Sequence, residues 1–223
     1  MAYIKNFEKP ETKHQRDVNT AKDNHNPWDN PTVKPVKSSQ TDFFHKHIQQ
    51  YSDLISWARW YPDLFLDLLK PETGGINLHF DQRVFLRCIL RFFSIYGVFP
   101  RGWSKTWGEV ISMFIIAILY PGITMSLTAQ TKANAAELLK DKYDEITRQF
   151  PLLKNEMYKP RVAKDDFELT FVNGSRIDVL ANAQTSKGQR RNRIQIEESA
   201  LLDAEVFDDA LKPIVEIGRT TKG

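Results

Sequence analysis

The sequence has very little cysteine, no long hydrophobic run and no strong excess of charge of one sign. Cys88 is its only cysteine, so no disulfide can form within the chain, which is typical of a reducing compartment. The most apolar run, Val110–Leu119, is about half as long as the roughly 20 residues of a membrane-spanning helix. We therefore expect a buried helix there and no membrane partner. With 31 Lys and Arg against 28 Asp and Glu, the net charge of +3 permits an anionic partner without requiring one.

Apolar side chains are plentiful enough for a core. Hydrophobic residues make up 41% of the 223 residues, which excludes wholesale disorder. Residues 1–40 differ from the rest because they are rich in Lys, Asn, Asp, Thr and Pro. We expect a flexible polar tail there, either simply disordered or docking on a partner, followed by one domain over residues 41–223.

The spacing of apolar residues changes along the domain from helical to alternating. It predicts a helical lead-in over 51–93, with helices at 51–60, 63–70 and 80–93. Further helices are expected at 105–120 and 133–150. Strands are expected at 94–99, 123–129, 167–172, 176–181, 193–196 and 214–217. This alternation predicts an α/β fold with a mainly parallel central sheet flanked by helices, and Asn173-Gly174 predicts a hairpin as an insertion or antiparallel edge.

One junction between a predicted strand and helix could hold phosphate. A phosphate loop needs backbone N–H groups around a turn, a lysine for the phosphates and a hydroxyl for Mg²⁺. Lys105-Thr106 at the start of a helix supplies the last two. The usual glycine pattern is only partly present, because Phe99 and Ser104 stand at its glycine positions and Gly102 is the only glycine inside the loop. The alternative is a solvated lysine near a helix N-terminus.

An acidic pair, Glu197-Glu198, follows the short predicted strand 193–196. In nucleotide hydrolases such a strand ends in two acids, of which the first orders Mg²⁺ and the second activates the attacking water. The alternative is a helix start, where acidic residues are favoured by the helix dipole. Gln195 is polar for a buried strand, and Glu197 stands where an aspartate is more usual.

Three arginines, Arg190, Arg191 and Arg193, precede the acidic pair. They could contact DNA phosphates or supply a charge to the nucleotide of a neighbouring subunit. A solvated basic turn is an equally good interpretation of each of them.

Four segments together resemble the N-terminal ATPase domain of the large terminase subunit, the DNA-packaging motor of tailed bacteriophages. The resemblance covers residues 51–223. The segments are 60–65 with 80–86, the loop 101–106, the acidic strand 194–199, and 214–221, where Ile-Val-Glu-Ile-Gly-Arg ends in two threonines. The resemblance implies a P-loop NTPase fold with ATP and Mg²⁺ as cofactors.

The resemblance also assigns roles to residues of this chain. Gln82 would contact adenine, and the loop Arg101, Gly102, Trp103, Ser104, Lys105 and Thr106 would hold the phosphates. Arg101 and Lys105 would neutralise phosphate charge, and Thr106 and Glu197 would hold Mg²⁺. Glu198 would activate water, and Thr220 and Thr221 would couple hydrolysis to movement. Arg190 and Arg191 are the candidates for a trans-acting arginine or a DNA contact.

The same resemblance implies partners and a location. Double-stranded DNA, a portal protein and a small terminase subunit would be the partners, with subunits forming a ring on the procapsid in the cytoplasm of a bacterial host. The nuclease domain of the family is not expected within these 223 residues. Two other functions stay open at this point, a degenerate adaptor that binds nucleotide or DNA without hydrolysis, and another DNA-remodelling ATPase such as a helicase.

Overall fold

The structure, a computed structural model, describes residues 46–73, 75–181, 186, 189–201 and 203–215. The chain divides into two units, 1–54 and 55–223, and each is considered by itself. In the first unit the described residues, 46–54, belong largely to the beginning of helix α4 (Ile48–Trp60). The expected tail and the two threonines Thr220 and Thr221 lie outside the described residues.

The helices begin and end within a few residues of where the apolar spacing predicts. After α4 come α5 (Pro62–Leu68), α6 (Phe80–Arg91), α7 (Lys105–Leu119) and α8 (Lys132–Gln149). Pro62 stands at the first position of α5, where its missing N–H costs nothing. At the start of α8 the Thr131 hydroxyl accepts a hydrogen bond from the Asn134 N–H.

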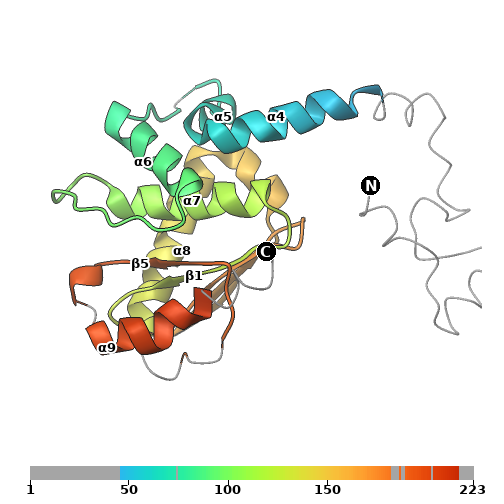
Figure 1. The fold of residues 1–223 in the computed structure, drawn as a ribbon. Coiled ribbons are helices and arrows are strands. Elements are labelled where there is room, and N and C mark those ends of the chain that lie inside the picture. The colour runs from blue at the N-terminus through green and yellow to red at the C-terminus, as the bar shows by residue number, and fades with distance from the viewer. Residues whose placement is uncertain (1–45, 74, 182–185, 187–188, 202, 216–223) are drawn as a thin grey trace, which may run out of the picture. The chain divides into compact units, whose positions relative to one another are not determined.

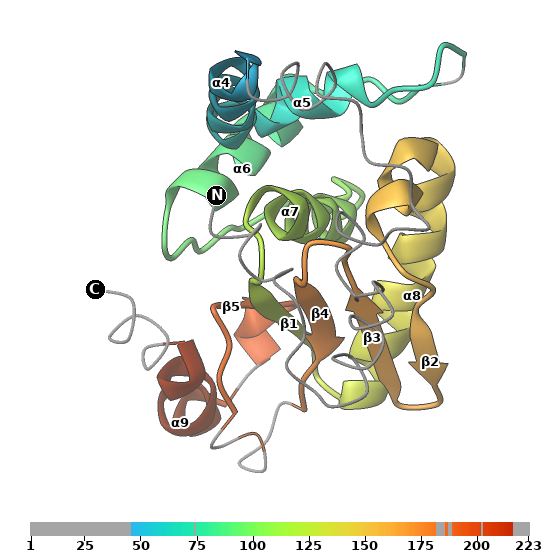
Figure 2. The ribbon, with the colours of Figure 1, turned by 90° about the vertical axis from the view of Figure 1, so that its right-hand side faces the viewer.

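The described strands form one mixed sheet in the order β2-β3-β4-β1-β5 (Figure 2). They are β1 (Thr124–Thr128), β2 (Arg161–Ala163), β3 (Asp166–Thr170), β4 (Arg176–Val179) and β5 (Arg193–Ile196). Strand β1 pairs in parallel with both β4 and β5, whereas β2 and β3 add on in antiparallel fashion. The expectation of a parallel centre with an antiparallel edge is confirmed.

Helices α7 and α8 cover the apolar face of the sheet, while α9 (Ala204–Val206) lies on the opposite side beside β5 (Figure 1). The Phe114 ring of α7 packs edge-on against the rings of Tyr143 and Phe171. On the other side, Leu211 and Ile214 pack with the strand residues Ile194 and Ile196. Strand β5 therefore has apolar cover on one side and α7 on the other.

Two expected strands are wrong. Residues 94–99 form no helix or strand and pair with no described strand, and Tyr96 and Val98 are largely exposed. Their β-branched and aromatic residues fit a strand, but a strand also requires a hydrogen-bonding partner. The other, 214–217, is helical at Ile214 and Val215, which continue the π-helix η4 (Phe207–Leu211) after α9 and let Ile214 pack against β5. The last two residues of that expected strand lie outside the described residues. Strand β2 and the 3-10 helix η1 (Pro151–Glu156) were not predicted.

Among the described residues, every helix is too short or too polar to cross a membrane.

Candidate functional site

The candidate site lies where α7 begins and β5 ends. Lys105 Nζ is 3.2 Å from Glu197 Oε1, and the Thr106 hydroxyl donates a hydrogen bond of 2.8 Å to the same oxygen. Glu197 is 8% exposed, so its carboxylate is held among these groups and largely away from water. The parallel pairing of β5 with β1 carries Glu197 to this end of the sheet. The fold thus joins the lysine, the hydroxyl and the first acid, which are about ninety residues apart in sequence.

The loop before α7 has the backbone of an anion cradle. Gly102 and Ser104 both have positive φ, of 80° and 64°, whereas Trp103 between them does not. Alternation of this kind turns successive N–H groups toward a common side, where the helix N-terminus adds partial positive charge. The Trp103 ring stacks on Phe99 with the ring centroids 4.3 Å apart, and both rings pack against Phe85 of α6. The loop is therefore braced by aromatic packing.

Ser104 stands in the left-handed conformation at a position where phosphate loops usually carry glycine, and its side chain makes no capping hydrogen bond to α7. A left-handed non-glycine residue costs about 1–2 kcal/mol. Replacing the residue with glycine removes this strain, but it also increases the conformational entropy of the unfolded chain, which offsets part of the gain. We expect Ser104→Gly to raise the free energy of unfolding by about 0.5–1 kcal/mol, measured by urea denaturation. Ser104→Ala, which keeps the strain, is the control, and a lower midpoint for Ser104→Gly would contradict the prediction.

Side chains alternate along β5, so polar ones face one side of the sheet and apolar ones face the other. Gln195 and Glu197 face α7, where the Gln195 amide donates a hydrogen bond of 2.9 Å to the Ser112 hydroxyl, while Ile194 and Ile196 face the opposite side. This contact accounts for a polar residue inside the strand. Directly after Glu197, Glu198 has a φ of 52° and is exposed. The left-handed turn therefore separates a buried acid from a solvent-accessible one.

Glu109 is a site residue that the sequence analysis missed. It lies one turn after Lys105 on α7, in hydrogen-bonding reach of the Glu197 carboxyl. Burial, together with the hydrogen bond and the negative charge of Glu197, raises the pKa of Glu109 to about 9. The signal in the sequence was a lone acid in an otherwise apolar helix, four residues after the lysine.

Burial alone would raise the pKa of Glu197, but hydrogen bonds from Glu109, Thr106 and Lys105 and the charge of Lys105 outweigh it and lower that pKa. At neutral pH the pair therefore shares one proton. Apart from the hydrogen bond between the two carboxyl groups, Glu109 Oε2 and Glu197 Oε2 are buried without a hydrogen-bond donor. Such carboxylate oxygens fit a hard divalent cation such as Mg²⁺. The described residues bring together no group of three or more His, Cys, Asp or Glu side chains able to hold a metal.

Gln82 lies on α6 and its side chain is engaged locally. Its Oε1 accepts a hydrogen bond of 3.0 Å from the His79 N–H, half of a capping box at the start of the helix. Helix α6 also contributes Phe85 to the aromatic cluster that braces the phosphate-loop candidate. Gln82 would have to give up this cap in order to contact a base.

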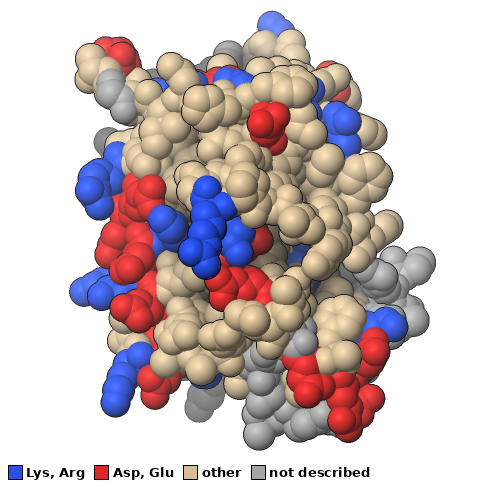
Figure 3. All heavy atoms as spheres, turned by 90° about the vertical axis from the view of Figure 1, so that its left-hand side faces the viewer, with Lys and Arg blue, Asp and Glu red and all other residues tan. Residues whose placement is uncertain are grey.

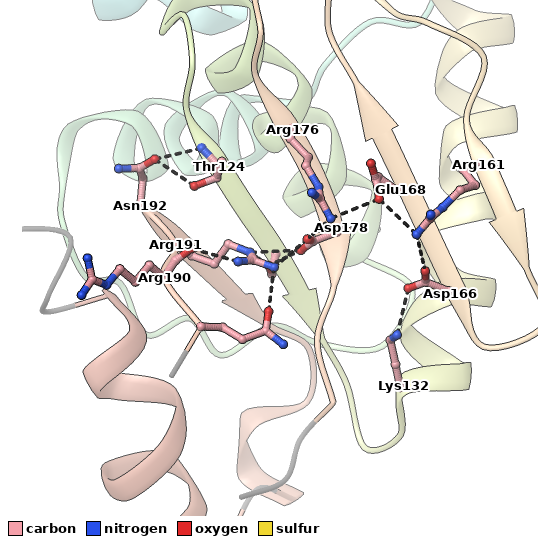
Figure 4. A network of polar contacts seen from close by, with 12 residues as sticks. Thr124, Lys132, Arg161, Asp166, Glu168, Arg176, Asp178, Arg190, Arg191 and Asn192 are labelled. Carbon is pink, nitrogen blue, oxygen red and sulfur yellow. Dashed lines mark hydrogen bonds and ion pairs between the residues drawn. The ribbon is translucent and has the colours of Figure 1, made fainter. Parts of the chain in front are cut away.

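Arg190 and Arg191 differ in their surroundings (Figure 4). The Arg191 guanidinium donates to Asp178 Oδ2 at 2.6 Å and to the Ser126 hydroxyl at 2.7 Å, and the Ser126 hydroxyl also bonds Asp178. The side chain of Arg191 is only 15% exposed. In contrast, Arg190 is exposed and points away from this network. Arg191 therefore holds its own sheet together, and of the two only Arg190 is free to reach another molecule.

The network around Asp178 continues across the sheet as alternating charges. Neighbouring members of opposite sign lie 2.9–3.2 Å apart, so the positive charges on this face are largely balanced. The members in order are Asp178, Arg176, Glu168, Arg161, Asp166 and Lys132. The network links β4 to β3, β2 and the start of α8 (Figure 4).

The surface near the loop before α7 and the end of β5 combines both charges. Figure 3 shows basic side chains gathered at the middle of this face directly beside acidic ones, within a largely uncharged surface. Arg101 of the loop is exposed, and Lys105 is 35% exposed. Cationic groups at the mouth of the site are thus accessible to an anionic ligand.

No protein family matches the sequence, and neither does any curated protein. Among solved structures, the large terminase ATPase domain of Thermus phage P74-26 is similar, with a TM-score of 0.43 and 13% sequence identity. A mutant of the same domain gives a TM-score of 0.42 and 14% identity. The similarity covers 53% of this chain and 53% of the first of these chains, and 52% of each for the second. This chain is therefore similar, over about half of its length, to a phage large terminase ATPase domain.

Proposed function

We propose that this chain is an Mg²⁺-dependent ATPase, the motor domain of a terminase-like protein that moves double-stranded DNA. The observation that carries the proposal is the meeting of Lys105, Thr106 and Glu197 at the junction of α7 and β5. A lysine, a hydroxyl and a carboxylate beside a helix N-terminus are the groups that nucleoside-triphosphate hydrolysis requires.

Phosphate binding falls to the loop and the start of α7. Lys105 now pairs with Glu197 at 3.2 Å, and incoming phosphates would compete for its ammonium group. The backbone around Gly102 and Ser104 would donate N–H groups, and exposed Arg101 would add a second positive charge. Thr106 and Glu197 would hold Mg²⁺, which when bound neutralises phosphate charge.

The attacking water would be activated by Glu198. This side chain is exposed, unlike that of Glu197, and it follows Glu197 directly, so it can meet a water molecule at the mouth of the site. An arginine from a neighbouring subunit would stabilise the transition state, and exposed Arg190 suits that role better than Arg191. Adenine contact by Gln82, coupling by Thr220 and Thr221, ring assembly, and binding to a portal and a small subunit are further parts of the proposal.

The test is release of phosphate from ATP with and without double-stranded DNA. We expect Glu198→Gln to lower kcat by about 10²-fold or more while ATP still binds, because a general base contributes about 10²–10⁴-fold. Glu205→Gln removes another exposed acid, on α9, and should leave turnover unchanged. Tight ATP binding without any turnover of the wild type would instead indicate a nucleotide-binding adaptor, and turnover that survives Glu198→Gln would remove Glu198 from its role.

A further inference from the structure

Three buried side-chain oxygens gather between α7 and β5. Within the described part of the chain, Glu109 Oε2, Glu197 Oε2 and Gln195 Oε1 accept no hydrogen bond from a backbone N–H, a hydroxyl, an amide or a cationic group. Glu109 approaches from α7, whereas Gln195 and Glu197 lie two residues apart on the same side of β5. Glu109 and Glu197 share a hydrogen bond, so a single proton is the partner of two buried carboxyl groups, and Gln195 Oε1 beside them has no donor. A divalent cation that replaced this proton would be held by both carboxyl groups.

The donors seen in this region are already directed elsewhere. Lys105 Nζ and the Thr106 hydroxyl both contact the other oxygen of Glu197, Oε1, at 3.2 and 2.8 Å. The Gln195 amide nitrogen donates to Ser112, and the Ser112 hydroxyl donates to the backbone carbonyl of Glu109 at 2.6 Å. Two carboxylates and an amide oxygen are ligands that a hard divalent cation prefers.

We propose that Glu109 is a second carboxylate ligand of the divalent cation at Glu197, and that the pair binds this cation before nucleotide arrives. The inference rests on the proposed function, in which Thr106 and Glu197 hold Mg²⁺. Two observations support it independently of sequence motifs. Glu197 is buried with one oxygen that neither Lys105 nor Thr106 contacts, and Glu109 reaches its carboxyl from the facing helix. Magnesium sites commonly use one or two carboxylates and complete their shell with water and phosphate oxygens.

Lys105 and the cation compete for Glu197 in this arrangement. The ammonium group lies 3.2 Å from Glu197 Oε1, so it lowers the negative charge that the pair offers to a cation. When phosphates draw Lys105 away, the negative charge of Glu197 is no longer offset by the ammonium group and is available to the cation. Nucleotide and cation binding should therefore reinforce each other through Lys105.

The test is titration of the nucleotide-free chain with Mn²⁺, a spectroscopic substitute for Mg²⁺, with free Mn²⁺ measured by electron paramagnetic resonance. We expect wild type to bind a single ion and Glu109→Gln to weaken its affinity about tenfold or more. Glu137→Gln is the matched control because it makes the same change at an exposed position of α8. Its affinity should equal that of wild type.

Two further variants keep the inference falsifiable. Glu197→Gln should weaken Mn²⁺ binding from the opposite side, and Lys105→Ala should tighten it severalfold, although the same change removes phosphate contacts. Thermal unfolding without metal checks that each variant is folded. Wild-type affinity in Glu109→Gln, or no Mn²⁺ binding by wild type, would overturn the inference.

The outcome is separable from that of the proposed function because the titration needs neither ATP nor turnover. Mn²⁺ binding that depends on Glu109 in a chain without ATPase activity refutes the ATPase and leaves the cation site standing. ATPase activity together with unchanged Mn²⁺ binding in Glu109→Gln supports the ATPase and refutes the role of Glu109 as a ligand.

Discussion

Lys105→Ala should lower kcat/KM for ATP by on the order of 10³-fold, the largest effect that we expect from a single change in the site. Lys105 is the only cationic side chain that the structure places at the start of α7, and its Nζ already lies against the carboxylate proposed to hold Mg²⁺. Removing it takes away a charge that would act on the phosphates in the ground state and more strongly in the transition state. Initial rates of phosphate release over a range of ATP concentrations would separate the losses in kcat and KM.

Lys140→Ala is the control for this experiment. Lys140 is an exposed lysine of α8, so its loss changes the net charge equally without touching the site. We expect its kcat/KM to match wild type. If Lys105→Ala retained more than about a tenth of the wild-type kcat/KM, Lys105 would not be the phosphate-binding lysine.

Much of the fold is predictable from sequence because the spacing of apolar residues matches the faces that are buried, and proline and glycine mark where helices and strands end. Strand β5 has the predicted bounds, Arg193–Ile196, and α7 begins at Lys105 as predicted. A short segment that alternates polar and β-branched residues and ends in two acids can be recognised without knowledge of its neighbours. The hairpin at Asn173-Gly174 is equally local, since Gly174 adopts the positive φ of 82° that such a turn requires.

Features that depend on pairing are less predictable. Residues 94–99 have strand-forming side chains, but whether a strand forms depends on a partner elsewhere, and in the structure Phe99 instead turns onto Phe85 and Trp103. Strand β2, with three exposed residues, has no buried face to reveal it in the sequence and exists because β3 pairs with it. Ile214 and Val215 are apolar and would suit a buried strand as well as a buried helix. Their helical conformation, in which Ile214 packs on β5, is not evident from the sequence.

The site is predictable in its residue types and less so in its contacts. The meeting of Lys105 and Thr106 with Glu197 follows from a strand and a helix that each present polar groups at one end. Glu109 could not be assigned in the same way, because an acid in an apolar helix gains a role only from the carboxyl that it faces across the fold. Likewise, Arg191 looks like its exposed neighbour Arg190 in sequence, and only the pairing of β4 with β1 brings Asp178 and Ser126 to it.

A second large effect is expected in the helical lead-in, from Asp63→Ala. Asp63 is fully buried and accepts hydrogen bonds of 2.7 and 2.9 Å from the Arg87 guanidinium, with Arg83 3.4 Å away. Removing one partner of a buried pair costs about 3–5 kcal/mol because the other charge is left uncompensated. Since the Arg87 side chain is 34% exposed and can recover some water, we expect a loss of about 3 kcal/mol in the free energy of unfolding. Urea denaturation would measure it.

Asp67→Ala is the matched control, because Asp67 also pairs with Arg83 but is 28% exposed, and a pair near the surface contributes only about 0–1 kcal/mol.

The loss in Asp63→Ala should also depend on pH. Burial alone would raise the pKa of Asp63, but the hydrogen bonds and charges of Arg87 and Arg83 outweigh it and lower that pKa below its usual range. A lowered pKa stabilises the fold above the usual pKa of aspartate, and this stabilisation is lost as the pH falls through the lowered value. Wild type and Asp63→Ala should therefore converge in acid, and a difference that persisted there would show that packing rather than the ion pair holds α5 against α6.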